Sequence, residues 1–451
     1  MNDENAQIRS ENTQRLKDSS HKNLISDISM AKVNEMEKLP EGWRRVRLGE
    51  VCEIIKSISK KKSYPYLEIG DIDICSKKYT IKEKTAPEHC LKAKTGNIVI
   101  SKVRPTRGAI SKIKEEVLYV SPALLVLNSQ NNNFLFYSLS RKVFLDHLGK
   151  RETGTTYPSV NDMDILDFEL NYPPLPEQRK IAEILETVDN AIEKTDKIIE
   201  KYKRIKQGLM QDLMTKGVDE NWNIRSEKTH KFKDSPLGRI PEEWGVVRLG
   251  KNIVNSIQYG YTSSAINKEL GPKFLRITDI QDNNVNWDLV PFCKINEKLI
   301  VKYKLEDGDI VFSRTGATTG KSYIIKNPPN SIFASYLIRI RTNNNIVNPQ
   351  FLGYFFNSYY YWTQIFTNLS GSAQEGFNAS KLKYLLILLP SLPEQQLIAE
   401  ILSQIDETIE KEQKYKEKLE RLKQGLMEDL LTGKVRVNHL INEVEENVHT
   451  A

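Results

Sequence analysis

The chain has 451 residues, of which 39% are hydrophobic and 28% charged, and its net charge is +7. This length allows two or three domains with ordinary buried cores, and the mild basic bias alone is only weak support for a nucleic-acid partner. The apolar runs are far shorter than the roughly 20 residues that cross a bilayer, and the four scattered cysteines form no CxxC pair. We therefore expect no membrane partner, disulfide framework or metal site. Because the polar N-terminus lacks a secretory signal, we expect a cytoplasmic protein.

The first half of the chain begins with a polar arm, residues 1–38, followed by a globular domain at residues 39–172. Short strand-like runs such as Asn97 to Ser101 alternate there with Gly, Asn, Pro and Ser turns and with some helical stretches. This mixture predicts an α/β (α+β) domain.

A long helix is expected next, within residues 173–217. Its apolar residues recur at steps of three and four, which is typical of a coiled-coil seam. Pro176 and Glu177 suit the first turn of a helix, since proline loses no hydrogen bond there and an acidic group complements the helix dipole. A helix of about 39 residues would be roughly 58 Å long. Gly208 lies inside it, and we expect this glycine to mark a close approach of two backbones.

The second half repeats this order: a polar linker (218–239), a second domain (240–388), a second helix (389–433) and a tail (434–451). LPEQRKIAEIL at 175–185 returns as LPEQQLIAEIL at 392–402, an offset of 217 (392 minus 175). Upstream, matching segments are offset by 201 (240 minus 39), 208 (274 minus 66) and 212 (308 minus 96). The helices therefore kept their length while the domains diverged. A pseudo-twofold relation would make the two helices antiparallel, and Gly425 repeats Gly208.

Two segments imitate catalytic motifs. TGATTGKS, Thr315 to Ser322, ends like a phosphate-binding loop, but its first glycine comes one position late. Asn171-Tyr172-Pro173-Pro174 contains the residues of an adenine-methyltransferase loop in the wrong order, and we interpret these prolines as the lead-in to the helix. No nuclease carboxylate set or nucleophile with a base is found, and His89 and His147 are isolated. This pattern favours a binding protein over an enzyme.

A resemblance rests on the order of the repeated motifs. Each half has an (L/I)PE-x-W-x-x-V-R-L entry segment, a Gly-Asp-Ile type strand and an LPEQ…IAEIL…KQGLM helix. Over residues 39–433 the chain resembles the specificity subunit of a type I restriction-modification system. The resemblance implies two target recognition domains separated by two long antiparallel coiled-coil helices, related by a pseudo-twofold internal repeat.

The same resemblance implies a non-catalytic subunit that reads a bipartite, asymmetric site on double-stranded DNA. Its partners would be two methyltransferase subunits, which carry S-adenosylmethionine and flip the target adenine, and two restriction subunits, which use ATP and Mg²⁺. No cofactor is expected on this chain.

Candidate DNA-binding residues come from polar and basic loops of the two domains. Sequence is read mainly at base edges in the major groove, while basic side chains on phosphates supply affinity. The candidates in the first domain are Lys102, Arg104, Arg107, Thr155, Thr156 and Tyr157. Those in the second are Arg314, Thr315, Thr318, Thr319, Lys321, Ser372 and Gln374.

Other functions remain open from the sequence. The chain could be the recognition subunit of another restriction-modification class or of a methylation-only system. A P-loop nucleotide-binding enzyme and a coiled-coil scaffold without a DNA role are alternatives from other classes.

Overall fold

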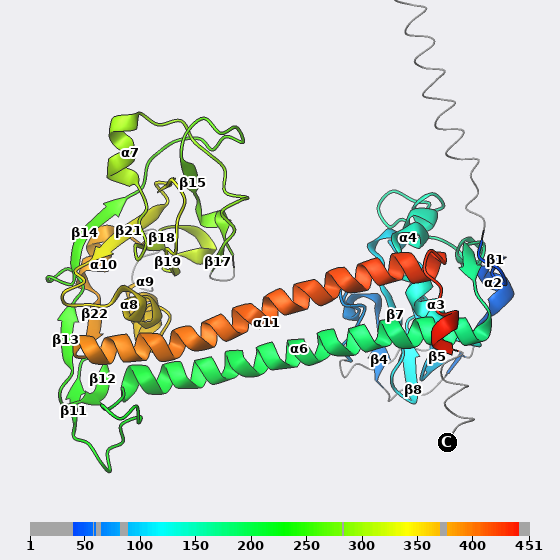
Figure 1. The fold of residues 1–451 in the computed structure, drawn as a ribbon, viewed down its shortest axis with the longest axis horizontal. Coiled ribbons are helices and arrows are strands. Elements are labelled where there is room, and N and C mark those ends of the chain that lie inside the picture. The colour runs from blue at the N-terminus through cyan, green and yellow to red at the C-terminus, as the bar shows by residue number, and fades with distance from the viewer. Residues whose placement is uncertain are drawn as a thin grey trace, which may run out of the picture. The chain divides into compact units, whose positions relative to one another are not determined.

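The computed structural model describes residues 39–56, 58–59, 65–81, 89–281, 284–369 and 377–441. The chain divides into two compact units, the first formed by residues 1–193 with 417–451 and the second by 194–416. Each unit holds one globular domain and parts of two long helices, α6 and α11 (Figure 1). None of the helices in these ranges is long and apolar enough to span a membrane.

The domain of the first unit is built on two small sheets. One has the strand order β2 (Cys52–Ile54), β9 (Leu124–Ser129), β6 (Ile98–Ser101), β7 (Ile110–Lys112), and the other β3 (Ile58–Ser59), β5 (Cys90–Lys94), β8 (Val117–Val120), β4 (Tyr66–Leu67). A further antiparallel pair joins β1 (Arg44–Arg47) to β10 (Glu169–Tyr172). The helices are α2 (Leu48–Val51), α3 (Asn132–Leu139), α4 (Lys142–Gly149), α5 (Asp162–Leu166) and the 3-10 turns η1 (Ile69–Asp71) and η2 (Pro105–Arg107).

The second unit repeats this plan. Its four-stranded sheet has the order β14 (Val254–Tyr259), β21 (Leu337–Thr342), β18 (Ile310–Ser313), β19 (Ser322–Ile324). Within the described ranges, four two-stranded sheets accompany it: β11 (Phe232–Ser235) with β12 (Gly238–Pro241), β13 (Gly245–Arg248) with β22 (Leu386–Leu389), β15 (Lys273–Leu275) with β20 (Ser331–Phe333), and β16 (Ile280–Gln281) with β17 (Asn284–Val285). The helices are α7 (Glu297–Tyr303), α8 (Pro349–Phe355), α9 (Tyr359–Leu369), α10 (Ala379–Tyr384) and the turns η3 (Ile277–Asp279) and η4 (Gly316–Thr318).

The central sheets of the two units share one topology, since a strand near the domain entry lies at one edge and a hairpin at the other. In the second unit Arg339 is only 2% exposed and lies 3.6 Å from the carboxylate of Asp309, which is also buried. The buried guanidinium donates in addition to the backbone carbonyl of Lys304 and to Gln258. In the first unit the corresponding pair of the central strands is Val99 with Val126, both fully buried. The divergent domains thus keep the same sheet around different buried side chains.

The helices α6 (Leu175–Thr215) and α11 (Leu392–Thr432) are both 41 residues long. In the second unit Asp196 of α6 pairs with Lys416 of α11, and Lys206 of α6 pairs with Asp406 of α11. The residue numbers rise by ten on α6 and fall by ten on α11, so the two helices are antiparallel. In the first unit the start of α6 shares a hydrophobic cluster with the end of α11. The predicted antiparallel helix pair and mixed domains are confirmed.

The expectation for the helix glycines is wrong. No neighbouring atom lies within 4 Å of a Cβ built on Gly208 or Gly425, apart from the helix's own backbone. The helices pair through longer side chains, and the glycines lie on exposed turns.

The contacts where the chain passes from each domain into its helix confirm that the prolines lead into the helix. Gln178 donates its side-chain amide to the carbonyl of Pro173 at 2.8 Å, and Gln395 donates to that of Pro390 at 2.9 Å. These contacts fix the direction in which the chain leaves the sheet. They also occupy the proline carbonyl that a methyltransferase loop would use on its substrate.

Each helix start carries a buried carboxylate that holds the segment following the other helix. Glu394 accepts from the Trp244 indole at 3.1 Å, from the backbone N–H of Val218 at 3.0 Å and from the Arg225 guanidinium. Glu177 accepts in the same way from Trp43 at 3.0 Å and from Arg436.

The segments after the two helices are thus held by these carboxylates. Residues 218–239, expected as a linker, include a buried Val218, the Glu394 contact and strand β11. The first part of the tail expected at 434–451 packs on the first domain through Arg436 and Val437.

Candidate nucleic-acid interface

The structure brings together the two candidate loops of the first domain. Val103 forms a β-bridge with Ser159, and the backbone N–H of Arg104 donates to the carbonyl of Pro158 at 2.6 Å. The Arg104 side chain donates to the carbonyl of Thr156 at 3.3 Å. Residues 102–107 and 153–160, about 50 positions apart in sequence, therefore form one surface.

Arg104 and Tyr157 are the distinctive pair on this surface. Arg104 has a left-handed backbone, with φ of +48°, and its guanidinium lies 5.1 Å from the centre of the Tyr157 ring. The Tyr157 side chain is 69% exposed. A guanidinium positioned on an aromatic ring keeps N–H groups free for the acceptors of a guanine edge or a phosphate.

The other candidates of the first domain differ in how available their side chains are for a contact with DNA. Lys102 pairs with Asp162 at 3.2 Å, so a phosphate would have to compete with that carboxylate. Arg107, Thr155 and Thr156 are exposed at the surface.

The second domain also places a candidate arginine on a tyrosine. The Arg314 guanidinium lies 4.8 Å from the centre of the Tyr259 ring, and the Arg314 backbone N–H donates to the carbonyl of Tyr336 at 3.1 Å. Tyr336 is 61% exposed. Sequence reasoning missed both tyrosines because they lie about 55 and 22 positions from Arg314, and no motif links them to it.

The loop 315–321 is closed on itself. The backbone N–H groups of Thr319, Gly320 and Lys321 donate to carbonyls of Gly316, Ser313 and Thr318. A strand, β19, follows instead of a helix. Because a phosphate-binding loop needs free amides at a helix start, this geometry argues against the P-loop alternative.

The candidate residues on this loop lie in different environments. Thr318 and Lys321 line a cavity of about 430 Å³ that α6 also lines through Lys203 and Lys206. The Thr319 hydroxyl donates to the carbonyl of Gly316 at 2.7 Å, and Thr315 is exposed. Ser372 and Gln374 lie outside the described residues.

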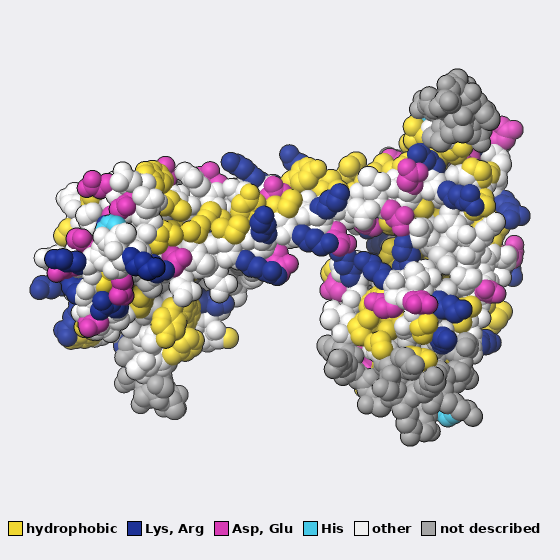
Figure 2. Space-filling model, turned by 90° about the horizontal axis from the view of Figure 1, so that it is seen from below, with side chains coloured by type: hydrophobic (Ala, Val, Ile, Leu, Met, Phe, Trp, Pro, Cys, Tyr) yellow, Lys and Arg dark blue, Asp and Glu magenta, His cyan; other side chains and the backbone are white. Residues whose placement is uncertain are grey.

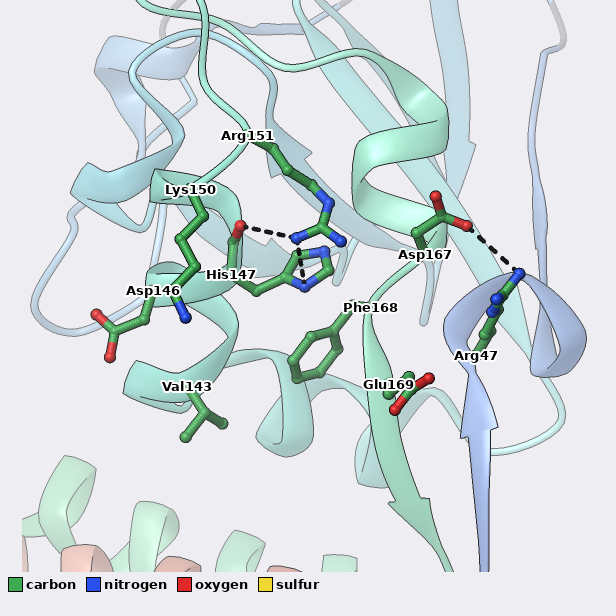
Figure 3. Close-up of a pocket in the computed structure, with 9 residues that line it drawn as sticks. All are labelled: Arg47, Val143, Asp146, His147, Lys150, Arg151, Asp167, Phe168 and Glu169. Atoms are coloured by element: carbon green, nitrogen blue, oxygen red, sulfur yellow. Dashed lines mark hydrogen bonds and ion pairs between the residues drawn. The ribbon is translucent and has the colours of Figure 1, made fainter. Parts of the chain in front are cut away.

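A cavity of about 550 Å³ opens on the first domain near α4 and β10 (Figure 3). Three basic side chains (Arg47, Lys150, Arg151) and three acidic ones (Asp146, Asp167, Glu169) line it with Val143, His147 and Phe168. The charges therefore balance, and the cavity has no net preference for an anion.

His147 is held in this cavity by both ring nitrogens. Nε2 lies 2.9 Å from the carbonyl oxygen of Asp164. Nδ1 lies 3.2 Å from the Arg151 guanidinium, a contact that Figure 3 shows. Burial lowers the pKa of His147, and the positive charge of Arg151 adds to this effect. A neutral ring that donates through Nε2 and accepts through Nδ1 satisfies both contacts, so the geometry supports a structural role for this histidine.

Among the residues that the structure describes, no group of three or more His, Cys, Asp or Glu side chains could hold a metal ion. What the described surface does offer is two similar domains, each with an arginine on a tyrosine, on a shared helix pair. This arrangement belongs to the class of multidomain sequence-reading proteins.

The comparisons with known proteins identify the class more closely. The family described as Type I restriction modification DNA specificity domain matches residues 40–203 and 241–421, and the chain belongs to this family. The chain is 33% identical over 429 residues to the type I restriction enzyme MjaVIII specificity subunit of Methanocaldococcus jannaschii, covering 89% of this chain and 95% of that protein. The predicted relationship and its DNA-specificity function are confirmed.

Solved structures show the same fold. The S subunit of a type I restriction-modification system from M. genitalium aligns with a TM-score of 0.59 at 14% identity, over 88% of this chain and 98% of that one. A chain from a study of complex assembly and conformational transition of the type I R-M system aligns with a TM-score of 0.52 at 22% identity, over 88% and 100%.

Proposed function

We propose that this chain reads a bipartite DNA site, one half with each globular domain, and that it carries no catalytic activity of its own. The observation that supports this best is the arginine-on-tyrosine contact, which each domain forms on a loop that follows its central strand β6 or β18. Two separate copies of a reading surface on one chain suit a site with two separate halves. Because the rest of the loops differ, the two halves would have different sequences.

The proposed contacts are those of the thirteen candidate residues, with Arg104 and Arg314 foremost. An arginine that reads guanine contributes about 1–3 kcal/mol of discrimination, and one that holds a phosphate weakens all sequences equally when removed. Tyr259 and Tyr336 join the candidates of the second domain because they lie beside Arg314.

We further propose that the helices bind two methyltransferase subunits and that two restriction subunits can join them. Figure 2 shows hydrophobic and basic side chains next to one another on the surface of the helices. The exposed large hydrophobic side chains of α6 and α11 are Ile198, Ile205, Tyr415 and Leu422. S-adenosylmethionine, ATP and Mg²⁺ would be bound by these partners, and the assembly would act in the cytoplasm.

The test uses the full chain with its methyltransferase partner. Methylated bases are mapped across a genome that carries these two genes, and one two-part motif with a fixed spacer is expected. Replacing residues 40–172 should change one half of the motif and leave the other. Absence of a split motif, or a change in both halves, would contradict the proposal.

A substitution tests the reading loops. Arg104→Ala should reduce binding of the complex at one half-site, either for one base or uniformly with a smaller salt dependence. Arg47→Ala is the matched control, since Arg47 lies in the charge-balanced cavity of the same domain. If both substitutions reduced DNA binding equally, the proposed DNA contact of Arg104 would be contradicted.

A further inference from the structure

In the second unit, a tyrosine and a lysine from two different elements both donate to one carboxylate on a third element. The Tyr354 hydroxyl, on α8 of the globular domain, donates to Oδ2 of Asp406 on α11 at 2.8 Å. Lys206 of α6 donates to Oδ1 of the same carboxylate at 2.6 Å. The Lys206 ammonium also lies 5.3 Å from the centre of the Tyr354 ring. A domain and both helices are therefore joined at Asp406.

The first unit contains the same arrangement with the helices exchanged. The Tyr137 hydroxyl, on α3, donates to Asp189 of α6 at 2.8 Å, and Lys423 of α11 pairs with Asp189 at 2.7 Å. Lys423 lies 5.7 Å from the centre of the Tyr137 ring. We call each set of tyrosine, aspartate and lysine a junction.

The three positions of the junction repeat at one offset. Tyrosine (354 minus 137), aspartate (406 minus 189) and lysine (423 minus 206) are each 217 residues from their counterparts, the offset of the repeated helix sequences. The domains around the tyrosines have otherwise diverged. Two independent copies of the same three-way contact indicate a shared role for it.

The chemistry of the junction favours a fixed geometry. Both phenols are buried, Tyr137 at 2% and Tyr354 at 7% exposure. Burial raises the pKa of each phenol, and the neighbouring carboxylate adds to the effect. Each hydroxyl therefore stays protonated and donates a hydrogen bond to the carboxylate. A buried hydroxyl needs a partner, and a hydrogen bond to a charged acceptor is shorter and stronger than one to a neutral acceptor.

We propose that Asp189 and Asp406 are positioning residues that hold each recognition domain at a set angle and height on the helix pair, and thereby select the spacer length of the DNA site. This inference rests on the proposed function. One extra base pair moves a half-site by about 3.4 Å along the helix axis and turns it by about 35°. A domain held at one position tolerates such a change poorly, because the complex must distort to bind.

The experiment measures how strongly the full complex, chain with methyltransferase, prefers its own spacer. Binding is compared on DNA with the native spacer and with spacers one and two base pairs longer or shorter. Asp406→Ala should reduce the preference for the native spacer about tenfold. Tyr354→Phe, which removes one oxygen and preserves the core, should reduce it in the same direction.

Asp196→Ala is the matched control. Asp196 pairs with Lys416 at 2.7 Å between the same two helices, and both residues belong to the helices themselves. The substitution therefore removes an ion pair between the helices and leaves Tyr354, Asp406 and Lys206 in place. It should leave the spacer preference unchanged.

A single half-site oligonucleotide separates positioning from folding. Because the reading loops are untouched, the variants should bind it as the unaltered complex does. An unchanged spacer preference in both Asp406→Ala and Tyr354→Phe, an equal loss in Asp196→Ala, or a parallel loss of half-site binding would each overturn the inference. If the unaltered complex prefers no two-part site at all, the proposed function itself fails.

Discussion

Glu394 should stabilise the second unit far more than a surface glutamate of the same helix. Its carboxylate is buried at 8% side-chain exposure and accepts from Arg225, Trp244 and the backbone of Val218. Glu394→Gln keeps the shape and removes the charge. Breaking a buried ion pair by changing one partner costs about 3–5 kcal/mol, because the other charge stays buried.

Hydrogen exchange at the Val218 amide is the assay, since that N–H donates to Glu394 at 3.0 Å. A cost of about 3–5 kcal/mol corresponds to exchange that is faster by roughly 100-fold to 4,000-fold, at 1.4 kcal/mol for each factor of ten. The control is Glu407→Gln, whose carboxylate is 67% exposed and 3.9 Å from Lys411. Such a pair contributes about 0.3–0.5 kcal/mol. Exchange that rises no more in Glu394→Gln than in Glu407→Gln would refute the reasoning.

Three further predictions concern stability. Gly208→Ala and Gly425→Ala should each raise the free energy of unfolding by about 1 kcal/mol in denaturant titrations, since open space surrounds both positions; a loss would mean an unseen close contact. Ending the chain at residue 433 removes Arg436 and should increase proteolysis of the first unit, whereas ending it at 441 should not. Arg339→Met leaves Arg341, at 3.0 Å, as the remaining cation on Asp309 and removes the donor to the Lys304 carbonyl and Gln258, so it should lower the thermal midpoint by the equivalent of about 1–3 kcal/mol; no measurable shift would show that these acceptors need no donor.

The sequence was a good guide wherever the contact is local or periodic. The three-and-four spacing predicts both helices, and Pro176 lies in the first turn of α6 as expected. The strand-like run at 97–101 contains β6. These elements depend on neighbours a few positions away, which a single sequence displays directly.

Contacts between distant segments could not be predicted in the same way. Tyr137 and Asp189 are 52 positions apart, and Arg225 and Glu394 are 169 apart. No pattern in the sequence pairs them, although the shared offset of 217 could have drawn attention to the tyrosines, aspartates and lysines. The helix glycines misled for the opposite reason, because repetition alone does not distinguish an exposed glycine from a packed one.

The division of the chain has a consequence for its synthesis. The second unit is a continuous stretch, 194–416, and can fold as soon as it leaves the ribosome. The first unit needs Arg436 and the end of α11, which are made some 240 residues after its own domain. At about 5–20 residues per second this is a delay of roughly 12–50 s. The contacts that complete the first unit therefore become available after those of the second unit, although its domain is translated earlier.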